Sequence, residues 1–400
     1  MLSEKSLRII ELTLPLVGSR IEEITPKFYA RLFAAHPELL DGMFNRSNQR
    51  PRVTGRHSDE KTQLSGRQQQ ALAGSIAVFA AHLVDSPDTL PEQMLTHIAN
   101  KHGSLGVTEE QYQVVYEHLF AAIAEDLEGV LTPDMATAWT EVYWLMAHAL
   151  IKLEKGLYNE QANDKMWTPW RVVDKRPAGL HAVTLTLEPA DNTPATPAHA
   201  GQYVGVKVPV DDGTRQVRQY SLSADAGTRR IITVKLIEGG EVSPILYQRV
   251  QTGDTLELSN PFGEITLKDD GGPVVLASAG IGCAHTASIL RSVAAQETDR
   301  DILVLHADTR LENWALRNQM IDDVASLDSA TLHLWLEQPE GDARPGFMSL
   351  REVELPDDAT LYLCGPVAFM KKIRHEAIDS GIPAARIHYE LFGPDTWLAG

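Results

Sequence analysis

MLTHIANKHGSLGV, residues 94–107, is the stretch on which the interpretation of the whole chain depends. In a helix that begins near Pro91, one face would carry three apolar residues and an imidazole at the spacing i, i+3, i+4 and i+7, namely Leu95, Ile98, Ala99 and His102. His102 is therefore predicted to point inward, and Gly103 is expected to end the helix. An inward histidine at a helix end is either a metal ligand or a core histidine bonded to a carbonyl. This stretch alone favours the core histidine.

The composition restricts the class of protein and its partners. A length of 400 residues suggests two or three domains, and a hydrophobic share of 43% gives each a core. The net charge of -18 argues against nucleic acid and against an anionic membrane surface. No apolar run approaches the roughly 20 residues of a membrane span, and charges such as Glu4 and Arg8 interrupt any signal-peptide core, so we expect a cytoplasmic protein. The 2 cysteines are too few for an iron–sulfur site.

Residues 1–155 show helical periodicity throughout and predict an all-α domain. Ser3 is a good cap for the first helix, and residues 50–65 are polar and predict an exposed loop. A helix from Arg67 would aim Gln68 at the interior together with Leu72, Ser75 and Phe79.

Glu154 lies in an apolar stripe of the helix predicted over Pro133–Tyr158, together with Tyr143, Ala147, Leu150 and Leu157. A buried carboxylate is costly unless it is hydrogen-bonded. We therefore expect Glu154 to have a partner. An inward imidazole N–H would serve, as would the hydroxyl of Tyr112, which is an inward residue of the helix predicted over Glu109–Leu127.

The pattern changes after a polar linker at residues 156–168. Short alternating segments separated by Pro, Gly and Asp turns predict an antiparallel β-barrel over residues 169–270; they are WRVVDK, AVTLTLE, QYVGVKVPV, VRQYSLS, IITVKLIE and TLELS. Within this region, Gly239–Ser243 precedes a short predicted helix whose free N–H groups would suit a phosphate.

Strands and helices alternate over residues 271–400, which predicts five strands in a doubly wound parallel sheet. Helices are expected near His285–Ala295 and Trp314–Val324, and from the CGP segment to Ser380. The turn Gly280-Ile281-Gly282 after the first strand would let a dinucleotide phosphate approach the backbone at a helix start. The sequence thus predicts three domains: all-α, then barrel, then α/β.

Several segments resemble one family along the whole chain. The segments MLSEKSLRIIELTLPLV, FYARLFAAHPEL, KHGSLGV and LEKGLYNE resemble the globin domain of bacterial flavohaemoglobins. Arg218-Gln219-Tyr220-Ser221 resembles the RxYS motif of the ferredoxin-reductase family, and Cys364-Gly365-Pro366 resembles its CGP motif. The resemblance implies a globin domain at 1–155, an FAD-binding barrel at 169–270 and an NAD(P)-binding domain at 271–400.

The resemblance implies a haem site around His102, which would be the proximal iron ligand. Tyr112 and Glu154 would lie beneath it, and Tyr29 and Gln68 would form the distal side. Further haem-binding residues are implied at Phe44, Leu72 and Lys101. Taken singly, Tyr29 would be a core tyrosine and Gln68 a solvated helix start.

The resemblance also implies how the reductase part would bind its cofactors. Arg218 would neutralise the flavin pyrophosphate, Tyr220 would stack on the isoalloxazine, and Ser221 would hydrogen-bond near its reactive nitrogen. Other flavin contacts are implied at Gln202, Tyr203, Gln219, Gly240, Val242 and Ser243. Dinucleotide contacts are implied at Gly280, Gly282, Cys364, Gly365 and Pro366. Glu390 would lie close to the flavin–haem path, and Phe392 would cover the flavin until nicotinamide displaces it.

This chain departs from the family pattern at one position that touches the dinucleotide turn. Ala284-His285 stands where the family usually has Thr-Pro, so a hydroxyl contact to the dinucleotide is expected to be lost. Taken without the resemblance, Arg218 would be a surface residue of an ordinary strand, and Cys283 and Cys364 would be small core residues.

The function implied is nitric oxide dioxygenase, in which electrons pass from NADH or NADPH through FAD to haem b, and nitric oxide and dioxygen become nitrate. No obligatory protein partner is inferred. Two other functions stay open at this point: a haem protein that only senses or stores dioxygen, and a flavin reductase for an external acceptor that uses residues 1–155 as a docking module. Asp308 suits a free ribose and Arg310 a phosphate, so the choice of dinucleotide is also open.

Overall fold

The computed structural model describes residues 2–44, 67–224, 228–268, 270–296 and 299–392. Its backbone contacts divide the chain into two compact units, which are described separately. The first unit is built on Met1–Glu160 with the short segment Asp211–Val217, and the second on Gln161–Val210 and Arg218–Phe392. The finer boundaries at 155, 168 and 270 stay predictions. Within the described residues, no helix is both long and apolar enough to cross a membrane.

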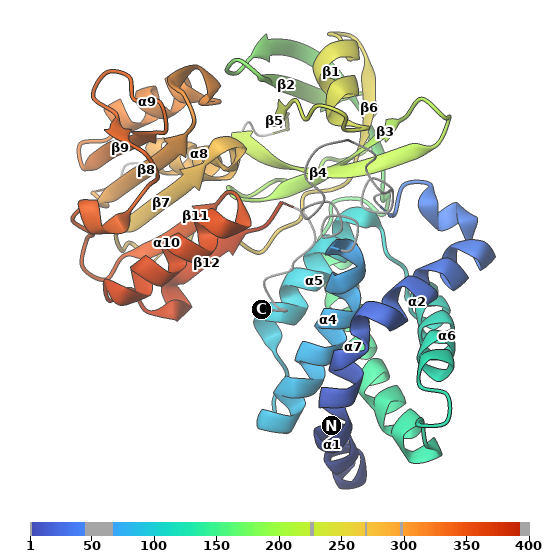
Figure 1. Cartoon of the computed structure of the whole chain (residues 1–400). Coiled ribbons are helices and arrows are strands. Elements are labelled where there is room, and N and C mark those ends of the chain that lie inside the picture. The colour runs from blue at the N-terminus through green and yellow to red at the C-terminus, as the bar shows by residue number, and fades with distance from the viewer. Residues whose placement is uncertain (1, 45–66, 225–227, 269, 297–298, 393–400) are drawn as a thin grey trace. The chain divides into compact units, whose positions relative to one another are not determined.

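The first unit is helical, as the sequence predicts (Figure 1). Its described helices are α1 (Glu4–Ser19), α2 (Ile21–Ala35), the short 3-10 helix η1 (Pro37–Leu40), α4 (Arg67–Asp85), α5 (Glu92–Leu105), α6 (Glu109–Asp126) and α7 (Pro133–Asn159). Ser3 caps α1, since its hydroxyl accepts from the Ser6 N–H at 3.1 Å. A capping box between Thr108 and Gln111 starts α6. The predicted loop at 50–65 lies outside the described residues.

Helix α5 does not end where the sequence analysis expects. The helix continues through Gly103 to Leu105, and Gly106, with φ of 76°, takes the left-handed conformation. The N–H of Val107 bonds the carbonyl of His102 at 3.2 Å, and the N–H of Gly106 bonds that of Gly103. This is a Schellman ending, in which the apolar residue after the glycine packs back on the core, and Val107 does so. His102 nevertheless remains in the last turn.

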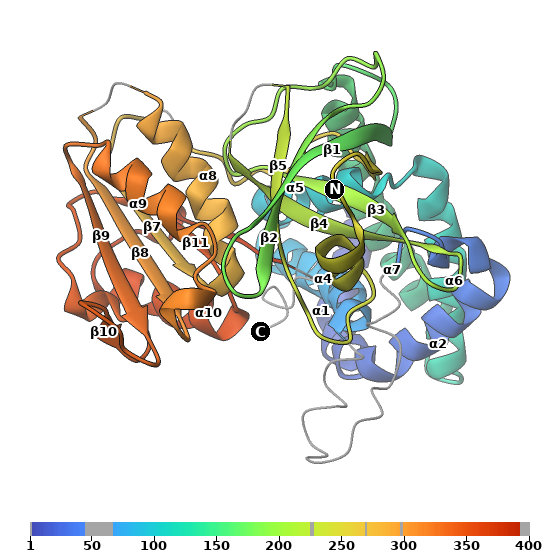
Figure 2. The same ribbon diagram turned by 90° about the horizontal axis from the view of Figure 1, so that it is seen from above.

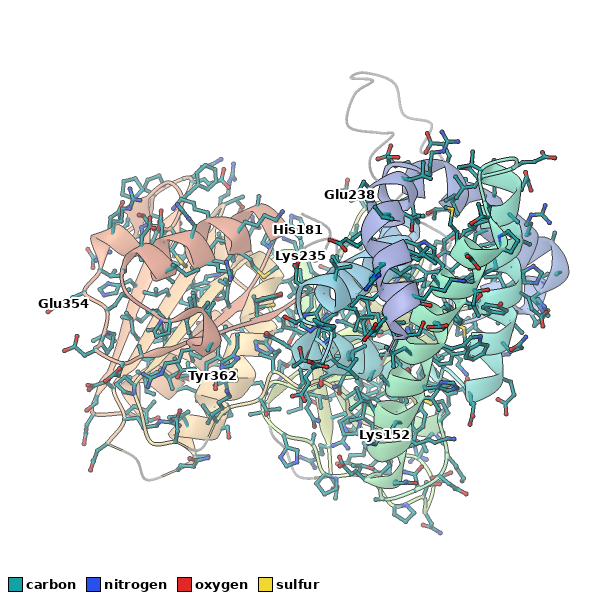
Figure 3. All side chains as sticks on the ribbon, turned by 90° about the horizontal axis from the view of Figure 1, so that it is seen from below. Lys152, His181, Lys235, Glu238, Glu354 and Tyr362 are labelled. Carbon is teal, nitrogen blue, oxygen red and sulfur yellow. The ribbon has the colours of Figure 1, made fainter. Side chains whose placement is uncertain are left out.

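The core of the first unit brings α5 against α7 (Figure 1). Leu95 and Ala99 of α5 are buried in the same cluster as Tyr143, Ala147 and Leu150 of α7. The inward faces predicted for both helices are therefore confirmed. Glu154 lies on the buried side of α7, whereas Lys152, two residues earlier, is exposed (Figure 3).

The second unit contains a closed antiparallel barrel, which confirms the predicted barrel (Figure 2). Its strand order is β1-β2-β5-β4-β3-β6. The strands are β1 (Thr168–Pro177), β2 (Ala182–Pro189), β3 (Tyr203–Pro209), β4 (Arg215–Ala224), β5 (Arg230–Lys235) and β6 (Thr255–Leu258). The segment after β5 leads into a single π-helical turn, η3 (Ile245–Arg249). Alternate residues fill the barrel, and Val204, Val206 and Val208 of β3 show this period of two.

The second unit also contains a six-stranded parallel sheet in the order β10-β9-β8-β7-β11-β12. Its strands are β7 (Val274–Ala279), β8 (Ile302–Asp308), β9 (Ala330–Leu336), β10 (Arg344–Pro345), β11 (Thr360–Cys364) and β12 (Ile387–Glu390). The sequence pattern predicts five strands and does not include β10, because two residues that include a proline give no strand pattern. The doubly wound class is confirmed.

Among the described residues, three α-helices cover the sheet: α8 (Cys283–Ala294), α9 (Arg317–Ala325) and α10 (Val367–Asp379). Helix α9 starts later than predicted, because Leu316 has φ of 60°, which no α-helix can include. The first two crossovers run from β7 toward β9 and the last runs from β11 to β12, so right-handed connections place α10 opposite α8 and α9 (Figure 1). The direction reverses between β7 and β11. That reversal is the topological switch point at which such sheets bind ligands.

Candidate functional site

His102, Tyr112 and Glu154 meet in the interior of the first unit. His102 Nδ1 lies 2.7 Å from Glu154 Oε1 and 2.9 Å from the Tyr112 hydroxyl oxygen. The Tyr112 hydroxyl donates to the same Oε1 at 2.5 Å. The Glu154 side chain is 3% exposed, whereas the His102 ring is 29% exposed. The partners expected for Glu154 are therefore both present at once.

This geometry fixes the tautomer of His102. A carboxylate only accepts hydrogen bonds, so the Nδ1 of His102 carries the proton and donates it. In the neutral ring, Nε2 is then the nitrogen with a lone pair, which is the form of imidazole that binds metals. Burial and the neighbouring Glu154 carboxylate raise the pKa of the Tyr112 hydroxyl, which therefore remains a donor.

Two further tyrosines support this group and were not predicted. The Tyr143 hydroxyl donates to the carbonyl of Tyr112 at 2.6 Å, and the Tyr158 hydroxyl donates to the carbonyl of Val107 at 2.9 Å. Both hold backbone next to the site, so they fix α6 and the end of α5. Tyr143 was visible in the sequence only as an inward residue of its helix, and its hydrogen bond has no sequence signature.

Tyr29 lies in an aromatic cluster on α2. Its ring stacks on Phe33 with centroids 5.5 Å apart and meets Phe44 edge-on at 5.8 Å. The residue is 4% exposed, and burial raises the pKa of its hydroxyl. Phe44 and Leu72 pack on the same core as partly buried side chains. Lys101 is also partly buried, and the side chain of Gln68 lies outside the described residues.

The predicted flavin residues of β4 present a polar site with an open hydrogen-bonding position. Ser221 is 3% exposed, and its Oγ has no hydrogen-bond partner among the described residues. Such a buried hydroxyl is costly without a partner, so a bound polar group would be favoured at this position. Burial raises the pKa of the neighbouring Tyr220 hydroxyl. Gln219 is partly buried on the same strand.

Arg218 faces the glycine segment that the sequence analysis assigns to phosphate. Its Nη2 lies 3.9 Å from Oε2 of Glu241, and the two side chains are 21% and 19% exposed. Gly240 is held in a turn, since its N–H bonds the carbonyl of Ile237 at 3.0 Å. The Ser243 hydroxyl accepts from the Ile237 N–H at 3.0 Å, and Val242 is buried. The structure thus brings Arg218 and this segment together.

Gln202 and Tyr203 lie where the barrel strand β3 begins. The side-chain oxygen of Gln202 accepts from the His199 N–H at 2.8 Å, and Tyr203 is buried and bridges to Phe262. Gln202 also accepts from the Leu222 N–H through its carbonyl at 2.9 Å, which ties it to the strand that carries Ser221.

The predicted dinucleotide segments meet at the switch point between β7 and β11. A Cβ on Gly282 would lie 2.2 Å from the carbonyl oxygen of Cys364, so only glycine allows this approach. A Cβ on Gly365 would lie 2.8 Å from the ring of Phe369. Pro366 caps α10. The structure therefore brings both predicted segments to one point of the sheet.

Residues around this point differ in exposure. Cys364 and Glu390 are both fully buried and are register partners on β11 and β12, whereas the Phe392 ring is 44% exposed.

Lys235 of β5, which was not predicted from the sequence, reaches the turn. Its Nζ is 3.9 Å from where a Cβ of Gly280 would lie (Figure 3). Cys283 is buried and its thiol has a raised pKa, so it is no nucleophile.

The family models that match the chain define its class. A globin model matches residues 26–150, and a model of the oxidoreductase FAD-binding domain matches residues 182–267. The chain thus combines a globin with an FAD-binding oxidoreductase module.

Curated relatives and solved structures identify the family. "Flavohemoprotein" of Rhizobium meliloti (strain 1021) is 35% identical over 99% of both chains, and that of Bordetella pertussis (strain Tohama I) is 36% identical over 98% of this chain and 99% of its own. A flavohemoglobin of Malassezia yamatoensis, solved with bound FAD and heme, has 39% identity and a TM-score of 0.91, covering 98% of this chain and 100% of that one. The chain belongs to the flavohemoprotein family and is an oxidoreductase.

Proposed function

We propose that this chain is an NAD(P)H-dependent nitric oxide dioxygenase with haem b and FAD as cofactors. The observation that carries the proposal is His102, whose Nδ1 lies 2.7 Å from the buried carboxylate of Glu154. Two nitric oxide and two dioxygen molecules would give two nitrates, while one NAD(P)H supplies the two electrons and releases a proton. The relative from Malassezia yamatoensis, described with bound FAD and heme, supports both cofactors.

The residues at His102 fit a haem. The Nδ1–H of His102 donates a hydrogen bond to Glu154, so Nε2 is left to bind iron. Phe44 and Leu72 offer apolar surface beside the core, as a porphyrin requires. When bound, haem supplies an iron that changes its oxidation state by single electrons, and FAD accepts a hydride and releases single electrons.

On the proximal side, Glu154 and Tyr112 would set the donor strength of His102. The carboxylate holds the proton on Nδ1 and so raises the electron density on Nε2. Tyr112 donates to Glu154 and keeps the carboxylate in place. A strongly donating histidine favours the activation of dioxygen over its reversible storage.

On the distal side, Tyr29 and Gln68 would steady the substrate dioxygen by donating hydrogen bonds. Because burial raises the pKa of the Tyr29 hydroxyl, that hydroxyl keeps its proton at neutral pH. The aromatic rings around it, Phe33 and Phe44, would keep water away from the oxygen that it contacts.

In the second unit, this chain's residues would hold FAD and the dinucleotide. The buried Ser221 hydroxyl fits a flavin ring polar atom, and Arg218 with Gly240 fits the pyrophosphate. Gly280, Gly282 and Gly365 would let the dinucleotide approach the backbone. The roles of Glu390 and Phe392 near the flavin belong to the same proposal.

Absorption spectra and nitrate formation test the proposal together. Purified protein, reduced with dithionite and exposed to carbon monoxide, should show a haem Soret band, and the oxidised protein should show flavin bands. With excess NADH or NADPH in air, added nitric oxide should appear as nitrate. The His102→Ala variant should lose the Soret band and nitrate formation, and a variant that keeps both would overturn the proposal.

The other two functions give different results in the same experiment. A haem protein that only senses or stores dioxygen would show the Soret band without rapid nitrate formation. A flavin reductase for an external acceptor would lack the Soret band even after haem is added. Comparing the rates with NADH and NADPH also assigns the dinucleotide.

A further inference from the structure

The peptide groups of one glycine in the second unit are held by two side chains of α8. The N–H of Gly201 donates to the Ser288 hydroxyl oxygen at 3.2 Å, and the carbonyl of Gly201 lies 3.1 Å from His285 Nδ1. Because a carbonyl only accepts, the His285 ring donates through Nδ1–H. Gly201 is thus bonded on both sides by residues that are three positions apart on one helix face.

The three residues of this contact are enclosed. His285 is 0% exposed and Ser288 is 1% exposed. Gly201 has φ of 101°, and a Cβ there would lie 2.1 Å from the carbonyl oxygen of Ile265, so no side chain could be added. The contact is therefore enclosed by the fold, and loss of either side chain would leave a buried polar group of Gly201 without its protein partner.

The contact connects the two predicted halves of the reductase site. Gly201 directly precedes Gln202 and Tyr203, the residues at the flavin end of β3. Helix α8 directly follows the turn Gly280–Gly282, to which the dinucleotide is assigned. His285 is the third residue of α8, so any shift of the first turn of α8 is transmitted to the peptide of Gly201.

We propose that His285 and Ser288 form a clamp, the Gly201 clamp, which sets the position of the flavin loop relative to the dinucleotide turn. Both are positioning residues: they act on hydride transfer through Gly201 rather than by touching a cofactor. The proposal rests on the reductase part of the proposed function. His285 stands at the position where the resemblance leads one to expect proline, whose ring has no donor for this carbonyl.

The clamp should affect the rate of hydride transfer more than the binding of the dinucleotide. Hydride transfer requires close and oriented donor and acceptor atoms, and a misplacement of about 1 Å can cost roughly 100-fold. In the proposed function the backbone at Gly280 and Gly282 would bind the dinucleotide, whereas the clamp's hydrogen bonds are made to Gly201. A partial loosening in His285→Ala is therefore expected to slow transfer by about 10-fold with less than about a 2-fold change in the apparent Kd.

Rapid mixing of the full-length protein, loaded with FAD, against NADH or NADPH measures both quantities. Bleaching of the flavin absorbance gives the limiting rate per bound flavin and the apparent Kd. His285→Asn keeps an N–H donor near the place of Nδ1 and should restore most of the rate. Ser288→Ala should slow the rate in the same direction. His375→Ala, at a side chain that is 76% exposed on α10, is the matched histidine control.

The combined variant sharpens the test, because two side chains that act on one peptide group are coupled. His285→Ala with Ser288→Ala should lose less than the product of the two single losses. A role in general stability only would lower the FAD content and leave the rate per bound flavin unchanged. If His285→Ala fails to fold, Ser288→Ala carries the comparison with the His375→Ala control, and His285→Asn should keep most of the rate of the unaltered protein.

The outcomes separate the clamp from the proposed function. If the flavin of the unaltered protein is not reduced by either dinucleotide, the proposed function fails and the clamp proposal fails with it. If that flavin is reduced normally and Ser288→Ala and His285→Ala match the His375→Ala control, only the clamp proposal fails. A slowed rate that His285→Asn does not restore also overturns it.

Discussion

The two units build their candidate sites from different parts of the chain. In the first unit the site consists of side chains: His102, Tyr112 and Glu154 come from three helices and meet through hydrogen bonds of 2.5–2.9 Å. In the second unit the site at the sheet consists largely of backbone, and glycines at 282 and 365 let segments approach closely. The site in the first unit depends on the donor and acceptor atoms of its side chains, whereas the site in the second unit depends on the absence of a Cβ at its glycines.

This difference predicts how each site fails. A side-chain site loses function when a donor or acceptor is replaced, while the fold around it stays intact. A backbone site loses function when a single methyl group is added, because backbone cannot move aside as a flexible side chain does. Substitutions of equal size should therefore affect the two units in different ways.

The largest effect is expected for Gly282→Ala in the second unit. The new Cβ would lie 2.2 Å from the Cys364 carbonyl oxygen, so the dinucleotide turn and the end of β11 must separate. Reduction of ferricyanide by NADH or NADPH should fall by about 100-fold or more. Gly272→Ala is the control, since its Cβ would meet only Asp270 Oδ1 at 3.7 Å. Equal rates for the two variants would contradict the backbone account.

Glu154→Gln should produce the next largest effect, and only in the first unit. The amide removes the negative charge next to the Nδ1 proton of His102, so Nε2 of the histidine would donate less electron density to the iron. Nitrate formation should fall by about 10- to 100-fold, with the rate of ferricyanide reduction unchanged. Lys152→Gln changes an exposed residue of the same helix and should match the unaltered protein. A parallel fall in ferricyanide reduction would show that the two sites are not separable.

Tyr29→Phe tests the side-chain account at a single hydroxyl. Loss of one hydrogen bond to dioxygen should speed dioxygen release by about 10-fold and lower nitric oxide turnover, with flavin reduction intact. Since burial raises the pKa of the Tyr29 hydroxyl, release from the unaltered protein should not accelerate as pH rises from about 7 to about 9. Stopped-flow absorbance measures the rate of dioxygen release from the variant, and from the unaltered protein at each pH. Unchanged release in the variant would remove Tyr29 from the distal role.

The sequence predicts different features of the two units. Helical periodicity placed Glu154 and Tyr112 on inward faces, and the cost of a buried carboxylate predicted the partners that the structure contains. Periodicity carries this information because it repeats over several turns. It does not carry the choice between Gly103 and Gly106 as the helix end, which depends on the contact that Val107 makes with the core.

In the second unit the sequence predicted the barrel, the doubly wound sheet and the glycine turn, but not the contacts across them. Leu316, with its left-handed φ, and the two-residue strand β10 have no pattern that marks them. The contact of His285 with Gly201 joins residues 84 positions apart, and the sequence showed only that Ala284-His285 was unusual. Such contacts are set by how elements pack, which local patterns do not encode.

The smallest effect expected is a gain, at Gly156 of α7. This glycine lies in the last turn of α7, two residues after Glu154, and a Cβ there would meet nothing within 4 Å. Gly156→Ala should therefore raise the free energy of unfolding of the first unit by about 0.5–1 kcal/mol, because alanine loses less conformational entropy in a helix. Thermal unfolding followed at the haem absorbance would measure the gain, and nitrate formation should stay at the level of the unaltered protein. A loss of stability would mean that the end of α7 is packed more tightly than the open space beside Gly156 indicates. An added methyl group would then be poorly tolerated in the helical unit as well as at the backbone site of the second unit.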